Sequence, residues 1–323
     1  MWGVTCQYNV CNHINLPRFQ EIVADFKNRL HVRAYVAGNV NRTGALEVVD
    51  LLIDNLKYRP VGTVEFPKTR INQMPIGEKC IRIRSFSLEG DTSVIKNIYQ
   101  VGIIDAKTRV ISDYLMEIIS EPMFNSLRTE KQLSYNPEMI FHDEFGVMQL
   151  QIHLITQAEK FGPEFVNREI DNFLEEFYLA EINKLTEQKM NTLRKEMIQS
   201  KKIYLESPME SEVVWEKVVT EDVDFDFLQH QINAWKDLKA KDIKDFFKKY
   251  LLRPSFVCKH YPNFVYEHRG WHYRKLSIQI VGYNATERRQ RRKLNEANDY
   301  SALEYLGNLI YGHGQNPFMV YTK

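Results

Sequence analysis

Apolar residues recur at helical spacing in two stretches near the start of the chain. The first stretch covers residues 16–30 and directly follows Asn15, a suitable helix cap, and the second covers residues 43–56. Each stretch predicts a helix with one buried face. The apolar positions are Leu16, Phe19, Ile22, Val23, Phe26 and Leu30 in the first stretch and Ala45, Val48, Val49, Leu52, Ile53 and Leu56 in the second.

A short alternating segment lies between these two helical stretches. Val32, Ala34 and Val36 alternate with more polar residues, and the turn residues Gly38 and Asn39 follow. The alternation predicts a half-buried strand. Because a helix-strand-helix unit of this size cannot bury enough apolar surface by itself, we interpret it as a partial copy of a larger layered domain.

The periodicity lapses between residues 58 and 79, where Pro60, Pro67 and Pro75 interrupt the chain. We interpret this stretch as a partly extended linker between domains. The predicted organisation is a partial domain at 1–57, a linker at 58–79, a second domain at 80–283 and a basic tail at 284–323.

The second domain mixes strand and helix patterns. Strand patterns cover residues 81–84, 94–104, 148–154 and 275–283, and helix patterns cover 108–119 and most of 163–250. Pro122 is expected to begin a new short helix that ends near Ser134. Since the strands and helices do not alternate as βαβ units, the pattern predicts an α+β fold: a largely antiparallel sheet covered by helices on one face.

Composition describes a globular chain without a strong overall charge. The 323 residues are 44% hydrophobic, and 43 basic against 42 acidic side chains give a net charge of +1. Such a balance creates no overall field to attract nucleic acid or an anionic membrane. No run approaches ~18 consecutive apolar residues and the first residues lack a signal-peptide pattern, so we expect a cytoplasmic protein. Four cysteines are too sparse for a disulfide framework.

Two groups of residues have part of a metal-ligand spacing. Cys6, Cys11 and His13 match no structural zinc pattern, and a fourth ligand is not evident. His268 and His272 have the i, i+4 spacing of two ligands on a helix, but a glycine and aromatic residues around them favour a solvated surface loop. We therefore expect no metal to be bound by this chain.

Residues 124–135, Phe-Asn-Ser-Leu-Arg-Thr-Glu-Lys-Gln-Leu-Ser-Tyr, have an amphipathic helical pattern in which Phe124 and Leu127 face a core and Arg128 faces water. With Ile-Ile-Ser-Glu-Pro just before it, this segment resembles the carboxy-terminal half of the insulinase/pitrilysin family of zinc metallopeptidases. The resemblance runs from about residue 16 to residue 283. It is also carried by Ile-Arg-Ile-Arg-Ser-Phe at 81–86, Asn-Ile-Tyr-Gln-Val-Gly at 97–102 and Arg-Lys-Leu-Ser-Ile-Gln-Ile-Val-Gly-Tyr at 274–283.

The resemblance implies an enzyme of two halves, each with two similar α+β domains of the LuxS/insulinase-like type, and with zinc in the amino-terminal half. This chain would supply the end of the third domain and the whole fourth. The family binds zinc through His-x-x-Glu-His, whose glutamate activates the attacking water. None of the nine histidines here lies in such a motif. The chain should therefore be inactive alone, with zinc expected in a partner half.

The same resemblance gives roles to side chains of the 124–135 segment. In the family an arginine and a tyrosine of the carboxy-terminal half reach the substrate backbone and the scissile carbonyl, and they fall on Arg128 and Tyr135. A guanidinium and a phenol can donate hydrogen bonds to the oxyanion that develops there. The predicted substrate-binding residues are thus Phe124, Arg128 and Tyr135, of which Arg128 and Tyr135 would assist catalysis.

Two local departures from the family pattern follow this segment. Ser134 stands where the family usually has glycine, and a serine would re-aim Tyr135 if the backbone needed positive φ at this position. Residues 136–139, Asn-Pro-Glu-Met, also differ from the β-rich continuation that we expect.

A basic run at residues 287–293 follows the last strand pattern. It fits a solvated tail, a nuclear-import or nucleic-acid patch, or a paired-basic sequence of the kind that is cleaved within this family.

Two functions remain open from the sequence. The first is a non-catalytic half that binds peptides, dibasic ones among them, and completes the chamber of a zinc-bearing half or homologous peptidase chain. The second is a catalytically inactive remnant that serves as a protein-interaction module. Neither a membrane nor a nucleic acid is expected as the partner.

Overall fold

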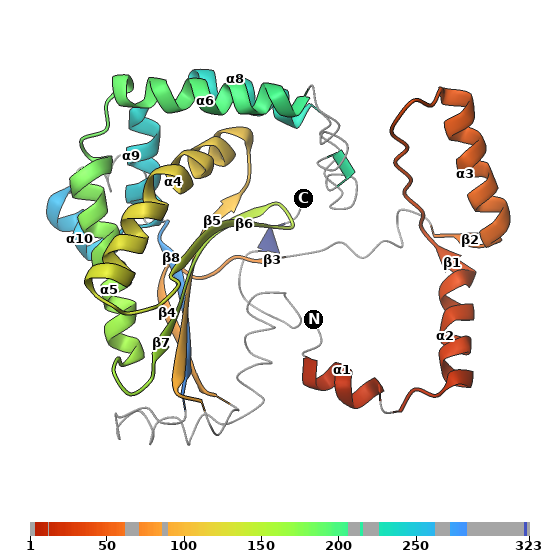
Figure 1. Ribbon diagram of the computed structural model, residues 1–323, viewed down its shortest axis with the longest axis horizontal. Helices are drawn as coiled ribbons and strands as arrows, with labels where there is room; N and C mark the ends of the chain where they lie inside the picture. Colours follow the sequence, from red (N-terminus) through yellow and green to blue (C-terminus); the bar gives the residue numbers. More distant parts are fainter. Residues whose placement is uncertain are drawn as a thin grey trace. The chain divides into compact units, whose positions relative to one another are not determined.

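The computed structural model describes residues 4–11, 13–61, 71–85, 90–205, 214–215, 226–261, 272–282 and 320–321 (Figure 1). Residues 1–69 and 204–225 form one compact unit, and residues 70–203 and 226–323 form a second. The basic run at 287–293 and His268 lie outside the described residues. Among the described helices, none combines the length and apolar character needed to cross a membrane.

The first unit is mainly helical. Its elements are α1 (Val4–Cys11), α2 (Leu16–Asn28), α3 (Arg42–Leu56) and a short parallel pair of strands, β1 (Arg29–Leu30) and β2 (Arg59–Pro60). The Oδ1 atom of Asn15 accepts a hydrogen bond of 3.0 Å from the backbone N–H of Arg18, and that of Asn41 accepts one of 2.8 Å from Gly44. Both predicted helices and the Asn15 cap are therefore confirmed.

Two expectations for this first unit are wrong. Residues 31–37 form no strand, because the extended segment stops at Leu30. In addition, none of the described residues of α2 or α3 is buried, and Leu16 and Phe26 are 68% and 69% exposed. The physical reason is that two strands of two residues each offer no sheet surface on which an apolar helix face could pack.

The second unit contains a five-stranded sheet of strand order β4-β8-β5-β7-β6. The β4–β8 pair is parallel and the other pairs are antiparallel, so the predicted α+β fold is confirmed with one parallel pair. The strands are β3 (Ile71–Asn72), β4 (Gly77–Arg84), β5 (Thr92–Ile103), β6 (Glu138–Glu144), β7 (Val147–Gln157), β8 (Arg274–Val281) and β9 (Val320–Tyr321).

Helices cover one face of this sheet (Figure 1). They are α4 (Ala106–Phe124), α5 (Pro163–Phe177), α6 (Glu187–Leu205), α8 (Phe227–Asp237), α9 (Ala240–Tyr250) and α10 (Pro254–His260), with the π-helical turns η2 (Asn125–Glu130) and η3 (Tyr178–Ile182). The main core lies between the two layers. Leu150 and Ile152 of β7 and Ile95 of β5 are fully buried there, as the alternation of β7 predicts.

The opposite face of the sheet carries a smaller apolar cluster of Met74, Ile98 and Leu276. The side chain of Gln100 joins this region by donating to the carbonyl of Asn72 at 2.9 Å and accepting from the N–H of Met74 at 2.7 Å. Asn72 and Met74 therefore pack on the sheet, although they lie in the stretch that the sequence predicts to be a linker.

The strand β6 overturns another expectation. It begins at Glu138, within the segment whose sequence departs from a β-rich pattern, and it pairs with β7 from Glu138↔His153 to Glu144↔Val147. Met139 and Phe141 contact the main core, while Ile140 is 53% exposed. Hydrogen bonding to β7 and burial of one face therefore stabilise β6, although its residues have a weak strand propensity.

Candidate functional site: an arginine between two aromatic rings

The helix α4 leads directly into the predicted site. Its N-terminus is capped by Asp105, whose Oδ1 atom accepts a 2.6 Å hydrogen bond from the N–H of Thr108. Pro122 lies inside this helix, so the expectation that it begins a new helix is wrong. Proline has no N–H for the usual bond to the residue four positions earlier. The N–H of Asn125 reaches the carbonyls of both Glu121 and Pro122, and the chain continues as the π-helical turn η2.

This turn brings the three predicted site residues together. The guanidinium carbon of Arg128 lies 4.7 Å from the ring centroid of Phe124 and 4.3 Å from that of Tyr135. Both distances are in the range of favourable cation–π contacts. Arg128 and Phe124 are half-buried, whereas Tyr135 is 81% exposed. We call this arrangement the Arg128 stack.

The segment that follows η2 holds Tyr135 in place through the backbone. Leu133 donates a 2.8 Å hydrogen bond to the carbonyl of Leu127, and both side chains are buried. Nearby, Lys131 forms a 2.8 Å ion pair with Glu169 of α5. The short connection before β6 is thus anchored to the core at one side and to α5 at the other.

The positive φ that the family pattern suggests for residue 134 occurs at a neighbouring residue. The residue with positive φ in this connection is Gln132, at 52°, and Ser134 is not among the residues in the left-handed region. A serine at this position therefore needs no strained backbone to place Tyr135. Its side chain is buried, and its hydroxyl has no hydrogen-bond partner among the described residues.

The donors of the Arg128 stack have no acidic partner among the described residues. No described carboxylate forms an ion pair with Arg128, whose guanidinium carries a positive charge and five N–H donors and contacts two aromatic rings. The phenol of Tyr135 adds one more donor beside it. Two aligned donors of this kind can bind a carbonyl or stabilise an oxyanion on a bound peptide.

The described residues do not provide a zinc site. They contain no group of three or more histidine, cysteine, aspartate or glutamate side chains placed to hold a metal ion. Cys11 is exposed and unpaired by a disulfide, and the sequence has no His-x-x-Glu-His motif. The sequence therefore lacks the ligand pattern through which the family binds zinc.

A second cluster of charged side chains lies inside the second unit, away from solvent. The ammonium of Lys275 on β8 lies 2.7 Å and 2.6 Å from the two carboxylate oxygens of Asp171 on α5, and these side chains are 0% and 4% exposed. The hydroxyl of Tyr99 donates to the same carboxylate at 2.9 Å. Burial and the neighbouring Asp171 raise the pKa of Tyr99 well above its usual value. These groups satisfy one another in the core and are not accessible to a ligand.

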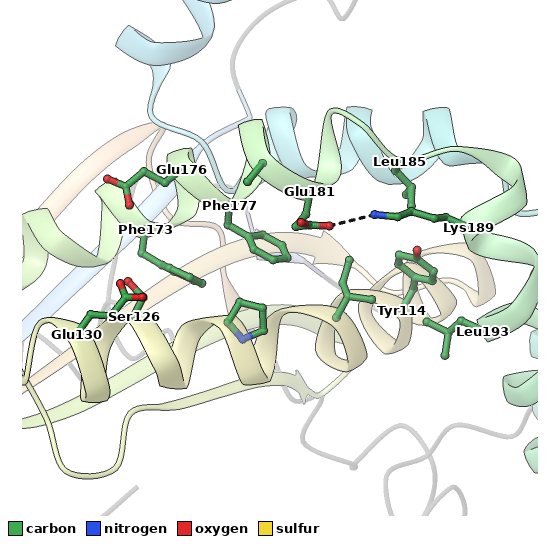
Figure 2. Close-up of a pocket in the computed structure, with 13 residues that line it drawn as sticks. Tyr114, Ser126, Glu130, Phe173, Glu176, Phe177, Glu181, Leu185, Lys189 and Leu193 are labelled. Atoms are coloured by element: carbon green, nitrogen blue, oxygen red, sulfur yellow. Dashed lines mark hydrogen bonds and ion pairs between the residues drawn. The ribbon is translucent and has the colours of Figure 1, made fainter.

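An open cleft of about 550 Å³ lies between α4 and η2 on one wall and α5, η3 and α6 on the other (Figure 2). Sequence reasoning did not single it out. Phe173 and Phe177 have the spacing of an ordinary core stripe, and Glu130 and Glu176 look like solvated helix positions. The one local signal is Pro122, a cleft-lining proline within an apolar helical pattern.

Comparisons with known proteins agree with this architecture. The family model described as "PQQ synthase PqqF-like, C-terminal lobe domain 4" matches residues 114–215. Human nardilysin is 26% identical over 289 residues, covering 88% of this chain and 23% of nardilysin. A nardilysin-like protein of Arabidopsis thaliana is 24% identical over 264 residues, covering 78% and 25%. Human insulin-degrading enzyme is 25% identical over 254 residues, covering 74% and 23%.

The solved structure of pitrilysin shares the fold, with a TM-score of 0.58 at 15% identity over 88% of this chain and 27% of pitrilysin. Together these findings show that the chain is similar in sequence to part of the carboxy-terminal half of nardilysin and insulin-degrading enzyme, and that it shares the fold of pitrilysin. It spans about a quarter of the length of the curated relatives it matches, 23% in the case of nardilysin.

Proposed function

We propose that this chain is the non-catalytic carboxy-terminal part of a nardilysin-like metallopeptidase. It binds the peptide substrate and completes the chamber of a zinc-bearing half, which supplies the metal and the activated water. The two parts meet in the cytoplasm. The observation that carries the proposal is the Arg128 stack, in which Arg128 contacts the exposed ring of Tyr135 and forms no ion pair with another described residue.

The chemistry of these two residues supports an assisting role. In a chamber closed by the second half, the guanidinium and the phenol would donate hydrogen bonds to the substrate backbone or to the oxyanion at the scissile carbon. Such donors act most strongly where water is excluded, because the local dielectric constant is low. The ring of Phe124 contacts the guanidinium of Arg128 and so limits the positions that this group can take.

The test mixes the purified chain with a zinc-bearing amino-terminal half and measures cleavage of fluorogenic dibasic peptides. We expect the mixture to cleave faster than the zinc-bearing half alone. Arg128→Ala or Tyr135→Phe should each reduce kcat about 10²-fold, the usual effect of removing one oxyanion donor. A mixture with no gain in rate, or a gain that both variants preserve, would contradict the proposal.

Arg168→Ala is the matched control for the arginine. Arg168 is an exposed arginine on α5 whose guanidinium carbon lies 5.7 Å from the ring centroid of Phe165, so it forms a cation–π contact outside the Arg128 stack. Its removal should leave the rate of the mixture unchanged. An equal loss of rate in this variant would indicate a general effect of surface charge.

The exposed apolar residues of α2 and α3 favour a second candidate, a protein-interaction module without a peptidase role. In that case the first unit would serve as the binding surface. Removal of residues 1–57 should then abolish partner binding and improve solubility. If the shortened chain unfolds instead, the first unit is required for the fold of the second and this candidate loses its support.

A further inference from the structure

The cleft between α4 and α5 has the composition of a binding groove and not of a packing defect. Its volume of about 550 Å³ lies within the usual range for ligand pockets, which is about 300–1,000 Å³. Figure 2 shows the rings of Phe173 and Phe177 directed from α5 into the gap toward α4. The other apolar lining residues are Tyr114, Ile118, Pro122, Ala180, Leu185 and Leu193.

Irregular backbone shapes both walls of this cleft. On one wall Pro122 lies within α4, and the π-helical turn η2 after it contributes Ser126 and Glu130. On the other wall the π-helical turn η3 contributes Ala180 and Glu181. A π turn shifts the side chains that follow it relative to an α-helix, so two facing helices with such turns do not close on each other.

The charged residues at the rim are predominantly acidic. The lining contains Glu130, Glu176 and Glu181, and Lys189 is the one basic residue among the described residues that line the cleft. Lys189 already forms an ion pair of 3.3 Å with Glu181. Glu130 and Glu176 make no ion pair with another described residue, and Figure 2 shows them on opposite walls toward the same end. A positive charge at that end would therefore be attracted from both sides.

We infer that this cleft binds a peptide segment of a partner protein that presents an aromatic or branched apolar side chain next to lysine or arginine. The apolar side chain enters between Pro122 and Phe177, and the basic side chain lies between Glu130 and Glu176. The inference is independent of the proposed peptidase role, because none of the three residues of the Arg128 stack lines the cleft.

Fluorescence anisotropy with the full chain provides the test. The probe is a short fluorescein-labelled peptide of repeated Arg-Phe-Leu triplets, and the two control peptides replace arginine by glutamate or both apolar residues by serine. We expect binding of the first peptide only, because each control removes one of the two complementary features. Equal binding of the glutamate peptide would overturn the inference.

Variants of the cleft give the second arm of the test. Glu130→Gln and Glu176→Gln should each weaken binding about threefold and make it less sensitive to salt. Ala180→Phe should weaken it about tenfold by filling the apolar part of the cleft. Glu117→Gln neutralises an exposed carboxylate on α4 outside the cleft and should have no effect. Binding that survives Ala180→Phe unchanged would contradict the inference.

Two further measurements test whether the variant folds and whether the chain binds to itself. If Ala180→Phe fails to fold by circular dichroism, Ser126→Phe fills the cleft from the opposite wall and replaces it. Sedimentation velocity without peptide tests the alternative occupant, a second copy of this chain. A wild-type dimer that Ala180→Phe converts to a monomer would overturn the inference in favour of self-association.

Discussion

Lys275 and Arg128 are both cations in contact with aromatic rings, but their surroundings are opposite. Lys275 is completely buried, lies 5.7 Å from the ring centroid of Tyr99 and is paired with the carboxylate of Asp171. Arg128 lies at the surface between two rings and forms no ion pair with a described residue. A buried charge must be neutralised for the chain to fold, whereas a surface charge can stay unpaired because water solvates it.

This contrast separates the structural role of Lys275 from the binding role that we propose for Arg128. The pair of Lys275 and Asp171 ties β8 to α5, so its loss should change the stability of the second unit and little else. The Arg128 stack contributes little to stability, so its loss should change ligand binding and little else. Unfolding measurements on variants of the two regions test this distinction.

The largest effect is expected for Lys275→Met. This change leaves the carboxylate of Asp171 buried without its cation, which should lower the free energy of unfolding by about 3–5 kcal/mol. Urea denaturation followed by circular dichroism measures the loss. Adding Asp171→Leu should restore part of it, because the second change removes the unpaired charge. A loss below about 1 kcal/mol would show that the pair is not essential to the core.

The second effect concerns alkaline pH. Burial raises the pKa of Tyr114 to about 12 and also raises the pKa values of Tyr99, Tyr178 and Tyr273. The folded state therefore keeps these protons after the unfolded chain begins to lose them near pH 10. Stability should be fully present below pH 10 and decline above it, by about 1.4 kcal/mol per tyrosine and pH unit.

Urea unfolding at several pH values between neutral and strongly alkaline checks this sign. Tyr114→Phe should make the decline less steep, because one fewer proton is retained by the folded state. A decline that Tyr114→Phe leaves equally steep would contradict this prediction.

The smallest effect is expected in the Arg128 stack itself. Tyr135→Ala should lower the free energy of unfolding by no more than about 1 kcal/mol, the usual value of an exposed cation–π contact. A double-mutant cycle with Arg128→Met measures the part of this loss that belongs to the contact. A coupling well above 1 kcal/mol would mean that the stack is part of the core, and its proposed role in binding would need revision.

The fold was largely predictable because long periodic segments dominate the second unit. The alternation of Leu150 and Ile152 in β7 and the stripe of α5 needed no tertiary information. Strand β6 could not be predicted in this way, since its structure depends on pairing with β7 and not on local propensity. The exposure of the apolar stripes of α2 and α3 could not be predicted either. A sequence pattern shows which face of a helix is apolar, but it does not show whether another element covers that face.

For the candidate site, the roles of its residues stay a prediction, and its geometry comes from the structure alone. Family resemblance selects Phe124, Arg128 and Tyr135, and the structure brings all three into contact. The four-residue spacing of Phe124 and Arg128 already makes them neighbours on a helix. The contact with Tyr135 depends on the path of the chain after η2, which periodicity does not describe. Periodicity also did not reveal which face of β8 packs against α5. Lys275 and Ser277 face α5, and the aliphatic residues of the strand do not.

The π-helical turn η2 also determines how this region can tolerate changes in chain length. Deleting one residue between Phe124 and Arg128 would allow the segment to return to regular α-helical pitch, where each residue turns the chain by about 100°. Arg128 would then follow Phe124 by three positions, a spacing at which two side chains on a regular α-helix are still neighbours. The contact with Phe124 should therefore survive a single deletion here, so the identity of these two residues matters more than their spacing.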